Sequence, residues 1–116
     1  MDWHGFMAET EGRVAKLSRE IPQTATGFGQ MGEAAKADAA LSEKTKEFIA
    51  LGIAIATRCD SCIGFHMRSL VRLGATRAEV CEALAMATYM GGGPSYAYSA
   101  KALDAFDTFT NGGAPA

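Results

Sequence analysis

The 116-residue sequence lacks any block of like charge. Eleven basic residues stand against thirteen acidic ones, which gives a formal net charge of -2, and neither sign is concentrated in one segment. Proteins that bind nucleic acid or anionic membranes present basic patches to them. We therefore expect neither nucleic acid nor a membrane as a partner.

A long apolar run is also missing. The longest near-continuous one, Phe48 to Ala56, is far shorter than the roughly 20 residues that cross a bilayer. The N-terminus has no basic segment that leads into an apolar stretch, so it does not resemble a secretory signal. We expect a soluble, cytoplasmic protein, in which the three cysteines are not a disulfide framework.

The sequence has little of the β-branched alternation that marks strands, and helix formers fill almost every segment. We therefore predict an all-α fold, a single-domain bundle of five to six helices. Residues 1–40 form its N-terminal helical segment, residues 41–110 its core and residues 111–116 a frayed tail. The expected helices span residues 8–20, 24–38, 43–58, 60–73, 77–90 and 95–109.

Capping residues mark several of these helix boundaries. Ser42 can cap the helix of residues 43–58, and Thr76 with Glu79 forms a Thr-x-x-Glu capping box. Gly74 is placed to end the helix before that box. Because the helix after Ser42 is apolar on all sides in its second half, we expect it in the middle of the domain.

Two groups of residues suggest close packing between helices or between subunits. Gly27, Gly29 and Gly32 each cost a helix about 1 kcal/mol relative to alanine, which close helix packing would explain. Trp3 and Phe6 precede the first expected helix on a short arm that a monomer would leave exposed. We interpret them as subunit contacts.

Methionines and tyrosines flank the turn of residues 91–94. These are Met86, Tyr89, Met90, Tyr96 and Tyr98. Such side chains at helical spacing usually fill gaps in a core, and we expect that role for most of them, with a substrate channel or an interface as the alternative. Cys81 is likewise expected to be a small core residue.

The stretch of residues 57–66, TRCDSCIGFH, holds two cysteines three apart and a histidine four residues further on. If Cys59 to Cys62 form the first turn of a helix, its free N–H groups and its dipole lower the pKa of at least one thiol. His66 is then one turn beyond Cys62 on the same face, where an imidazole can exchange protons with the thiol. This pattern indicates a reactive dithiol with its own base.

Glu47 lies at the polar start of the preceding helix. If the two helices form a tight hairpin near Arg58, Glu47 lies about 15 Å before the turn and His66 about 10 Å after it. A carboxylate there could orient the imidazole and pass protons outward, which makes a relay of four residues. The alternative is a solvated residue on a charged helix face, and the sequence does not separate the two.

Two other interpretations of the cysteine pair stay open. One is an inert, reduced pair at the start of a core helix. The other is a zinc site, for which Glu47 would be an unusual fourth ligand beside Cys59, Cys62 and His66.

The spacing of Glu47, Cys59, Cys62 and His66 resembles the motif of the AhpD-like alkylhydroperoxidases within the carboxymuconolactone decarboxylase family. The resemblance covers residues 41–109 and includes the segments EKTKEFIALGIAIATRCDSC and ATRAEVCEALAMATYMGGGPSYAYSAKAL. It implies an all-helical fold and a homo-oligomer, either a trimer or a hexamer. It also implies an enzyme that reduces hydroperoxides with its dithiol, without a bound cofactor, and that a lipoylated or thioredoxin-like protein reduces again.

By this resemblance Cys62 attacks the peroxide and Cys59 resolves the product. Helix-end electrostatics alone favour Cys59, but His66 favours Cys62, and we side with the latter. Better-studied members have a histidine directly before the second cysteine, where this chain has Ser61, so a weaker relay or a different oxidant is an alternative. Two further alternatives are an acid-base enzyme like the decarboxylases, which lack the cysteine pair, and a non-catalytic redox-sensing module.

Overall fold

The structure is a computed structural model that describes residues 1–111. Its helices are α1 (Trp3–Glu20), α2 (Pro22–Lys36), α3 (Glu43–Ala56), α4 (Asp60–Arg72), α5 (Arg77–Gly91) and α6 (Gly93–Thr110). Since this part of the chain contains six helices and no strand, the prediction of an all-α fold is confirmed. None of these helices is long and apolar enough to cross a membrane. The predicted frayed tail lies outside the described residues, except for Asn111, which caps α6.

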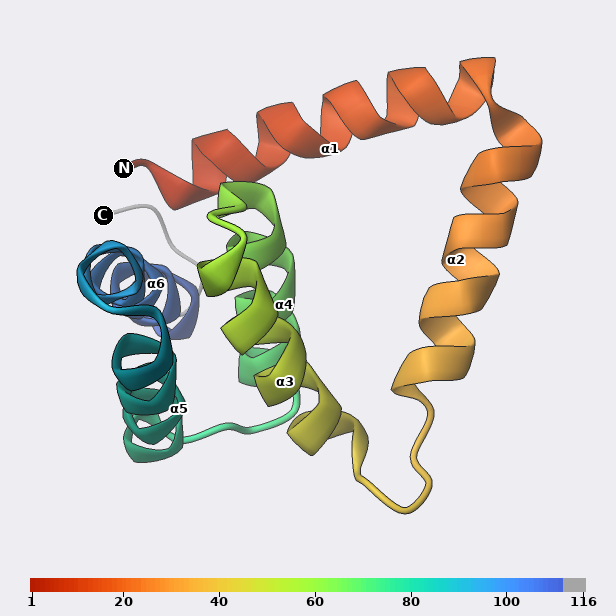
Figure 1. The fold of residues 1–116 in the computed structure, drawn as a ribbon. Coiled ribbons are helices and arrows are strands. Elements are labelled where there is room, and N and C mark those ends of the chain that lie inside the picture. The colour runs from red at the N-terminus through yellow and green to blue at the C-terminus, as the bar shows by residue number, and fades with distance from the viewer. Residues whose placement is uncertain (112–116) are drawn as a thin grey trace.

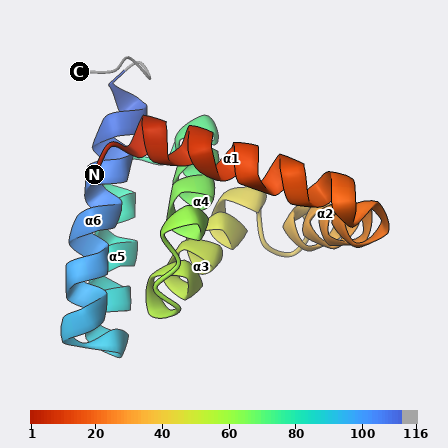
Figure 2. The same cartoon turned by 90° about the horizontal axis from the view of Figure 1, so that it is seen from above.

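The helices α3 to α6 form the body of the molecule, in which α3 lies beside α4 and α5 beside α6 (Figure 1). Helix α1 lies across α4 and α6, and α2 leads away from the body on the side opposite α5 and α6 (Figure 2). Helix α2 therefore contacts α1 and α3 but forms no part of the central bundle.

The hydrophobic core lies where α3 to α6 meet the start of α1. Its most deeply buried side chains are Trp3, Leu51, Ile55, Ile63, Met67, Leu70 and Val80. A fully buried side chain of this size stabilises the fold by about 1.5–3 kcal/mol. Because α3 and α4 each contribute several of them, their relative position is firmly fixed.

The capping residues predicted from the sequence act as expected. Ser42 Oγ accepts a hydrogen bond from the backbone N–H of Thr45 at 3.1 Å. Thr76 and Glu79 exchange the two reciprocal hydrogen bonds of a capping box. Gly74 follows α4 with a φ of 78°, a left-handed conformation that glycine adopts without strain.

The N-terminal residues differ from the prediction. Helix α1 begins at Trp3, because the Asp2 carboxylate caps it by accepting a hydrogen bond from Gly5 N at 3.1 Å. Trp3 is 1% exposed, and its ring packs edge-on against Phe6 and Phe109. The expectation that Trp3 and Phe6 form an exposed arm for subunit contacts is therefore wrong, since they close one end of the core.

The glycines of α2 are not explained by close packing within this chain. A Cβ at Gly27 or Gly29 would meet open space, and at Gly32 it would approach only a side chain of the same helix. No side chain of α2 is buried, and Phe28 and Met31 are largely exposed. The helix therefore gains little stability from the rest of its own chain.

Helix α3 is not surrounded on all sides, as its sequence suggested. Leu51 and Ile55 face the core and are fully buried, but Ile49 and Ile53 are 50% and 59% exposed. These two residues line the cavity between α2, α3 and α4. The helix therefore packs against α4, α5 and α6 but leaves one face open to this cavity.

Most of the side chains around residues 91–94 are not in the core either. Met86, Tyr89, Met90 and Tyr96 are all exposed, and Tyr98 packs against the core. Core packing was thus the wrong expectation for the first four, because α5 and α6 present them on their outer faces. Cys81 is half-buried in a groove between these helices rather than in the core.

Gly64 allows α1 to cross α4 closely. A Cβ at this position would overlap the buried side chain of Met7. We expect Gly64→Ala to lower the free energy of unfolding by about 1–2 kcal/mol, although alanine favours a helix. Gly12→Ala is the control, because a Cβ there meets open space, and it should raise that free energy by about 0.5–1 kcal/mol. Urea unfolding measures both, and stabilisation by Gly64→Ala would contradict the close approach.

Candidate dithiol site

A tight turn between α3 and α4 places the cysteine pair. Arg58 has a φ of 56°, in the left-handed region that residues other than glycine rarely adopt. The chain thereby reverses, and the backbone N–H of Cys59 donates to the carbonyl of Ala54 at 3.0 Å. The turn brings α4 back alongside α3 with the cysteines at its beginning.

Cys59 and Cys62 are joined in a disulfide, with their Cα atoms 5.2 Å apart. Cys59 is the N-cap of α4, and its sulfur accepts a hydrogen bond from the backbone N–H of Cys62 at 3.2 Å. The hydroxyl of Ser61 lies 3.4 Å from the same sulfur. Since both sulfurs sit at the positive end of the α4 dipole, the site favours thiolates once the disulfide is reduced.

Glu47 and His66 meet across the hairpin of α3 and α4. The Nδ1 atom of His66 lies 2.7 Å from Oε2 of Glu47, a hydrogen bond that a neutral imidazole forms as donor. In that tautomer Nε2 is the nitrogen able to accept a proton. The Glu47 side chain is 1% exposed and that of His66 30%, so the alternative of a solvated Glu47 is wrong.

The burial of Glu47 is unfavourable on its own. Its Oε1 atom is buried and has no hydrogen-bond partner among residues 1–111. A buried carboxylate with one partner costs free energy relative to an apolar side chain of the same size. Its presence is therefore better explained by what it does to His66 than by stability.

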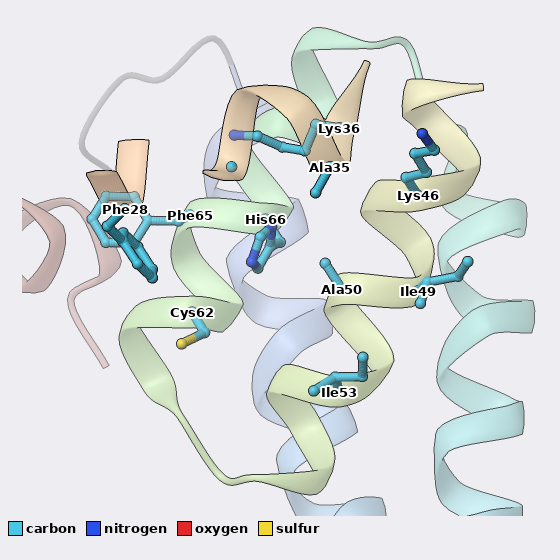
Figure 3. A pocket seen from close by; sticks show the side chains of 11 residues that line it. Phe28, Ala35, Lys36, Lys46, Ile49, Ala50, Ile53, Cys62, Phe65 and His66 are labelled. Carbon is cyan, nitrogen blue, oxygen red and sulfur yellow. The ribbon is translucent and has the colours of Figure 1, made fainter. Parts of the chain in front are cut away.

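An apolar cavity of about 550 Å³ opens between α2, α3 and α4 (Figure 3). Cys62 and His66 line it, whereas Cys59 and Glu47 do not. The remaining lining residues are Phe28, Gly32, Ala35, Lys36, Lys46, Ile49, Ala50, Ile53 and Phe65. Cys62 is therefore the sulfur that a molecule in this cavity would meet, beside the imidazole.

An ion pair from a distant part of the sequence borders the cysteines. Lys101 Nζ of α6 lies 3.2 Å from Oδ1 of Asp60, the residue next to Cys59. Without a partner, the negative charge of Asp60 would disfavour a thiolate at the neighbouring cysteines. The ammonium group of Lys101 offsets that charge. Sequence analysis missed Lys101, since no local pattern connects residues so far apart in the chain.

The four predicted site residues are brought together, but not as a metal site. Glu47 contacts His66, and Cys62 shares the cavity with His66, while Cys59 pairs with Cys62. Among the described residues, no group of three or more His, Cys, Asp or Glu side chains converges as metal ligands would. The geometry thus matches a dithiol with a neighbouring base.

Comparison with known proteins places this arrangement in a family. The model of the carboxymuconolactone decarboxylase family matches residues 22–105, which include all four of these side chains. The chain belongs to the carboxymuconolactone decarboxylase family. Its resemblance to AhpD-like proteins fits this membership.

Proteins of similar sequence align with nearly the whole length of this chain. An uncharacterized protein from Cupriavidus necator is 36% identical over 101 residues, which is 87% of this chain and 89% of that protein. An uncharacterized protein from Haemophilus influenzae is 37% identical over 105 residues, or 90% and 93%.

Solved structures of the carboxymuconolactone decarboxylase family share the fold. A family protein from Legionella pneumophila, crystallised in apo form, superimposes with a TM-score of 0.90 at 47% identity and covers 93% of this chain and 96% of its own. A family protein from Thermotoga maritima gives a TM-score of 0.72 at 27% identity and covers 78% and 94%. The latter is described as a candidate participant in an antioxidative response.

Proposed function

We propose that this family member is an AhpD-like, thiol-dependent peroxidase and disulfide reductase, in which Cys59 and Cys62 reduce hydroperoxides. The observation that carries the proposal is that Cys62 and His66 line one cavity while Glu47 holds the imidazole from behind. A base beside a thiol at a helix N-terminus is an arrangement that activates sulfur as a nucleophile. The description of the Thermotoga maritima relative is in accord with this chemistry.

In the oxidative half of the cycle, His66 takes the proton of the Cys62 thiol at Nε2. The thiolate attacks the distal oxygen of the hydroperoxide, the O–O bond breaks, and the leaving alkoxide takes the proton from the imidazolium. Cys62 is thereby oxidised to a sulfenic acid. The Cys59 thiol then attacks that sulfur, water leaves, and the disulfide forms. One hydroperoxide and two thiols thus give an alcohol, water and the disulfide.

In the reductive half, an external dithiol opens the disulfide. We propose the lipoyl group of a carrier protein, or a thioredoxin-like protein, as this donor. One donor thiolate attacks the disulfide to form a mixed disulfide, and the second donor thiol displaces the enzyme sulfur. The donor is oxidised by two electrons, and Cys59 and Cys62 are restored as thiols. Neither half of the cycle calls for a bound cofactor.

The experiment that tests this function is the consumption of dihydrolipoamide in the presence of tert-butyl hydroperoxide. We expect a rate that is proportional to the protein concentration and that depends on both reactants. The absence of peroxide-dependent consumption, with protein whose cysteines have first been shown to be reduced, would contradict the proposal.

A second candidate function follows from the position of Glu47 and His66. This pair would serve acid-base chemistry in the apolar cavity even without the sulfurs, as in a decarboxylase-like reaction on a small lactone or cyclic acid. Turnover of such a substrate that persists after Cys59 and Cys62 are both replaced by serine would favour this function over the first.

We also propose that the chain forms a homo-oligomer, a trimer or a hexamer. Helix α2 buries no side chain and exposes Met31, and Tyr89 of α5 and Tyr96 of α6 are exposed as well. A short helix that packs so little within its own chain is marginal in water, and exposed apolar faces of this kind mark association surfaces.

The mass in solution tests this assembly. Light scattering should give a mass about three or six times that of the 12.2 kDa chain. Met31→Glu should shift the mass toward the monomer, whereas Glu33→Gln on the same helix should not. A wild-type mass of a single chain would contradict the proposal.

A further inference from the structure

We propose that the cavity beside Cys62 binds an aliphatic carboxylate, so that the preferred oxidant is a carboxylate-bearing alkyl hydroperoxide of the fatty-acid class, held at its anionic end by Lys36 and Lys46. The inference rests on the proposed function of the same site and adds the chemistry of the substrate. It is carried by the apolar wall of the cavity, the charges at its rim and the register of α3 and α4.

The wall of the cavity is suited to a hydrocarbon chain. Ile49, Ile53 and Phe28 line it and remain half or more exposed to water, and Phe65 completes the wall. Removing this apolar surface from water favours the binding of a hydrocarbon chain. Hydrogen peroxide is too small and too polar to cover these side chains, whereas an aliphatic chain of several carbons would.

Two lysines lie at one rim of this apolar cavity. Lys36 ends α2 and Lys46 lies in the first turns of α3, and the loop between the helices brings both to the cavity. The Nζ atom of Lys46 donates to the carbonyl of Ala37 at 2.6 Å, which holds it in place. An ammonium group has three N–H donors, so Lys46 keeps two for a ligand.

The charge of Lys36 is not neutralised by the chain. No carboxylate of residues 1–111 forms a salt bridge with it. The neighbouring cations, Arg68 and Arg72, differ in this respect because each is paired with a glutamate of another helix. A lysine at a helix C-terminus also stabilises its own helix, so the test must separate ligand binding from that effect.

The register of the α3–α4 hairpin sets the separation of Lys46 from the sulfur of Cys62. The bond between Glu47 and His66 fixes which residues of the two antiparallel helices lie level. Lys46 is one residue further from the turn than Glu47, and Cys62 is four residues nearer to it than His66, which separates them by about 7.5 Å along the helix axes.

The close-up view of the cavity agrees with this register. Lys36 and Lys46 lie on one side of the cavity, with Cys62 and Ile53 toward the other (Figure 3). A carboxylate bound at the lysines would direct its chain along Ile49 and Ile53 toward Cys62. A hydroperoxide group some carbons away from the carboxylate would then reach the sulfur and the imidazole together.

Binding to the oxidised protein tests this inference without turnover, because the disulfide form cannot attack a peroxide. Isothermal titration calorimetry would compare octanoate, 1-octanol and octylammonium, which share one chain and differ in charge. We expect octanoate to bind about tenfold more tightly than octanol, octylammonium to bind most weakly, and the advantage of octanoate to shrink as salt is added. Lys36→Gln and Lys46→Gln should each weaken octanoate binding about threefold to fivefold and leave octanol binding unchanged.

Lys16→Gln is the matched control, since Lys16 is exposed on α1 and does not line the cavity. It should bind octanoate as the wild type does, and octanol binding verifies that the variants are folded. Equal affinity for octanoate and octanol, no binding of either, or wild-type octanoate affinity in both lysine variants would overturn the inference. The rate with tert-butyl hydroperoxide, which carries no carboxylate, tests the peroxidase function separately. A negative binding result would therefore overturn this inference without contradicting that function.

Discussion

Cys62→Ser is expected to abolish peroxide-dependent turnover, with a loss on the order of 10³-fold or more. Cys62 is the sulfur that lines the cavity together with His66, so it is the one that a bound hydroperoxide can meet. A serine hydroxyl has nearly the same size but does not ionise in this pH range and is a poor nucleophile toward peroxide oxygen. The dihydrolipoamide assay measures the loss, and a full wild-type rate would refute the proposed chemistry.

The other cysteines serve as controls because they differ in position. Cys59→Ser should still form a sulfenic acid on Cys62 in a single turnover, which dimedone would trap, but it should fail in multiple turnovers because no disulfide can form. Cys81→Ser should retain the wild-type rate, since Cys81 lies in a groove between α5 and α6. If Cys59→Ser lost the first step and Cys62→Ser kept it, the assigned roles would be reversed.

The spacing of Cys62 and His66 was predictable from the sequence because it depends on local geometry, whereas the sequence left open whether Glu47 would meet His66 or stay solvated. Four residues make one helical turn, which relates Cys62 to His66, and a tight hairpin brings Glu47 level with the imidazole. The caps at Ser42 and Thr76 were predictable for the same reason, since a capping residue acts within three positions of itself. The caps and the Cys62–His66 spacing do not depend on how the helices pack, whereas the contact of Glu47 with His66 requires the hairpin of α3 and α4.

The cavity and its surroundings were not predictable, because they depend on how distant elements meet. Phe28 reaches the cavity through the angle between α1 and α2, and Lys101 reaches Asp60 from another helix. The prediction for Trp3 was wrong because Asp2 caps α1 and thereby starts the helix at Trp3. Ile53 looked like a core residue, since an apolar side chain in a cavity wall and one in a core have the same sequence pattern.

His66→Ala is expected to slow sulfenic acid formation by about 10²- to 10³-fold, the usual contribution of a positioned general base. Stopped-flow measurement of single turnovers with reduced protein isolates this step from reduction by the donor. Because His66 lines the open cavity, added imidazole should restore part of the rate. Added imidazole should not restore the rate of Cys62→Ser. If His66→Ala formed sulfenic acid at the wild-type rate and added imidazole had no effect on it, His66 would have no part in the mechanism.

Glu47 acts through His66 as a positioning residue, and its variant should reveal that dependence. Glu47→Gln keeps the size of the side chain and one acceptor for Nδ1 but removes the charge that stabilises the imidazolium, so we expect a loss of more than about tenfold and at most the roughly 10⁴-fold of the corresponding change in a Ser-His-Asp triad. In the His66→Ala background the same substitution should cost nothing further, because there is no imidazole left to orient. Urea unfolding should show that Glu47→Gln is at least as stable as the wild type, since a buried carboxylate with one unpaired oxygen is replaced by a neutral group. Additive losses in the double variant would mean that Glu47 supports the site by a route other than His66.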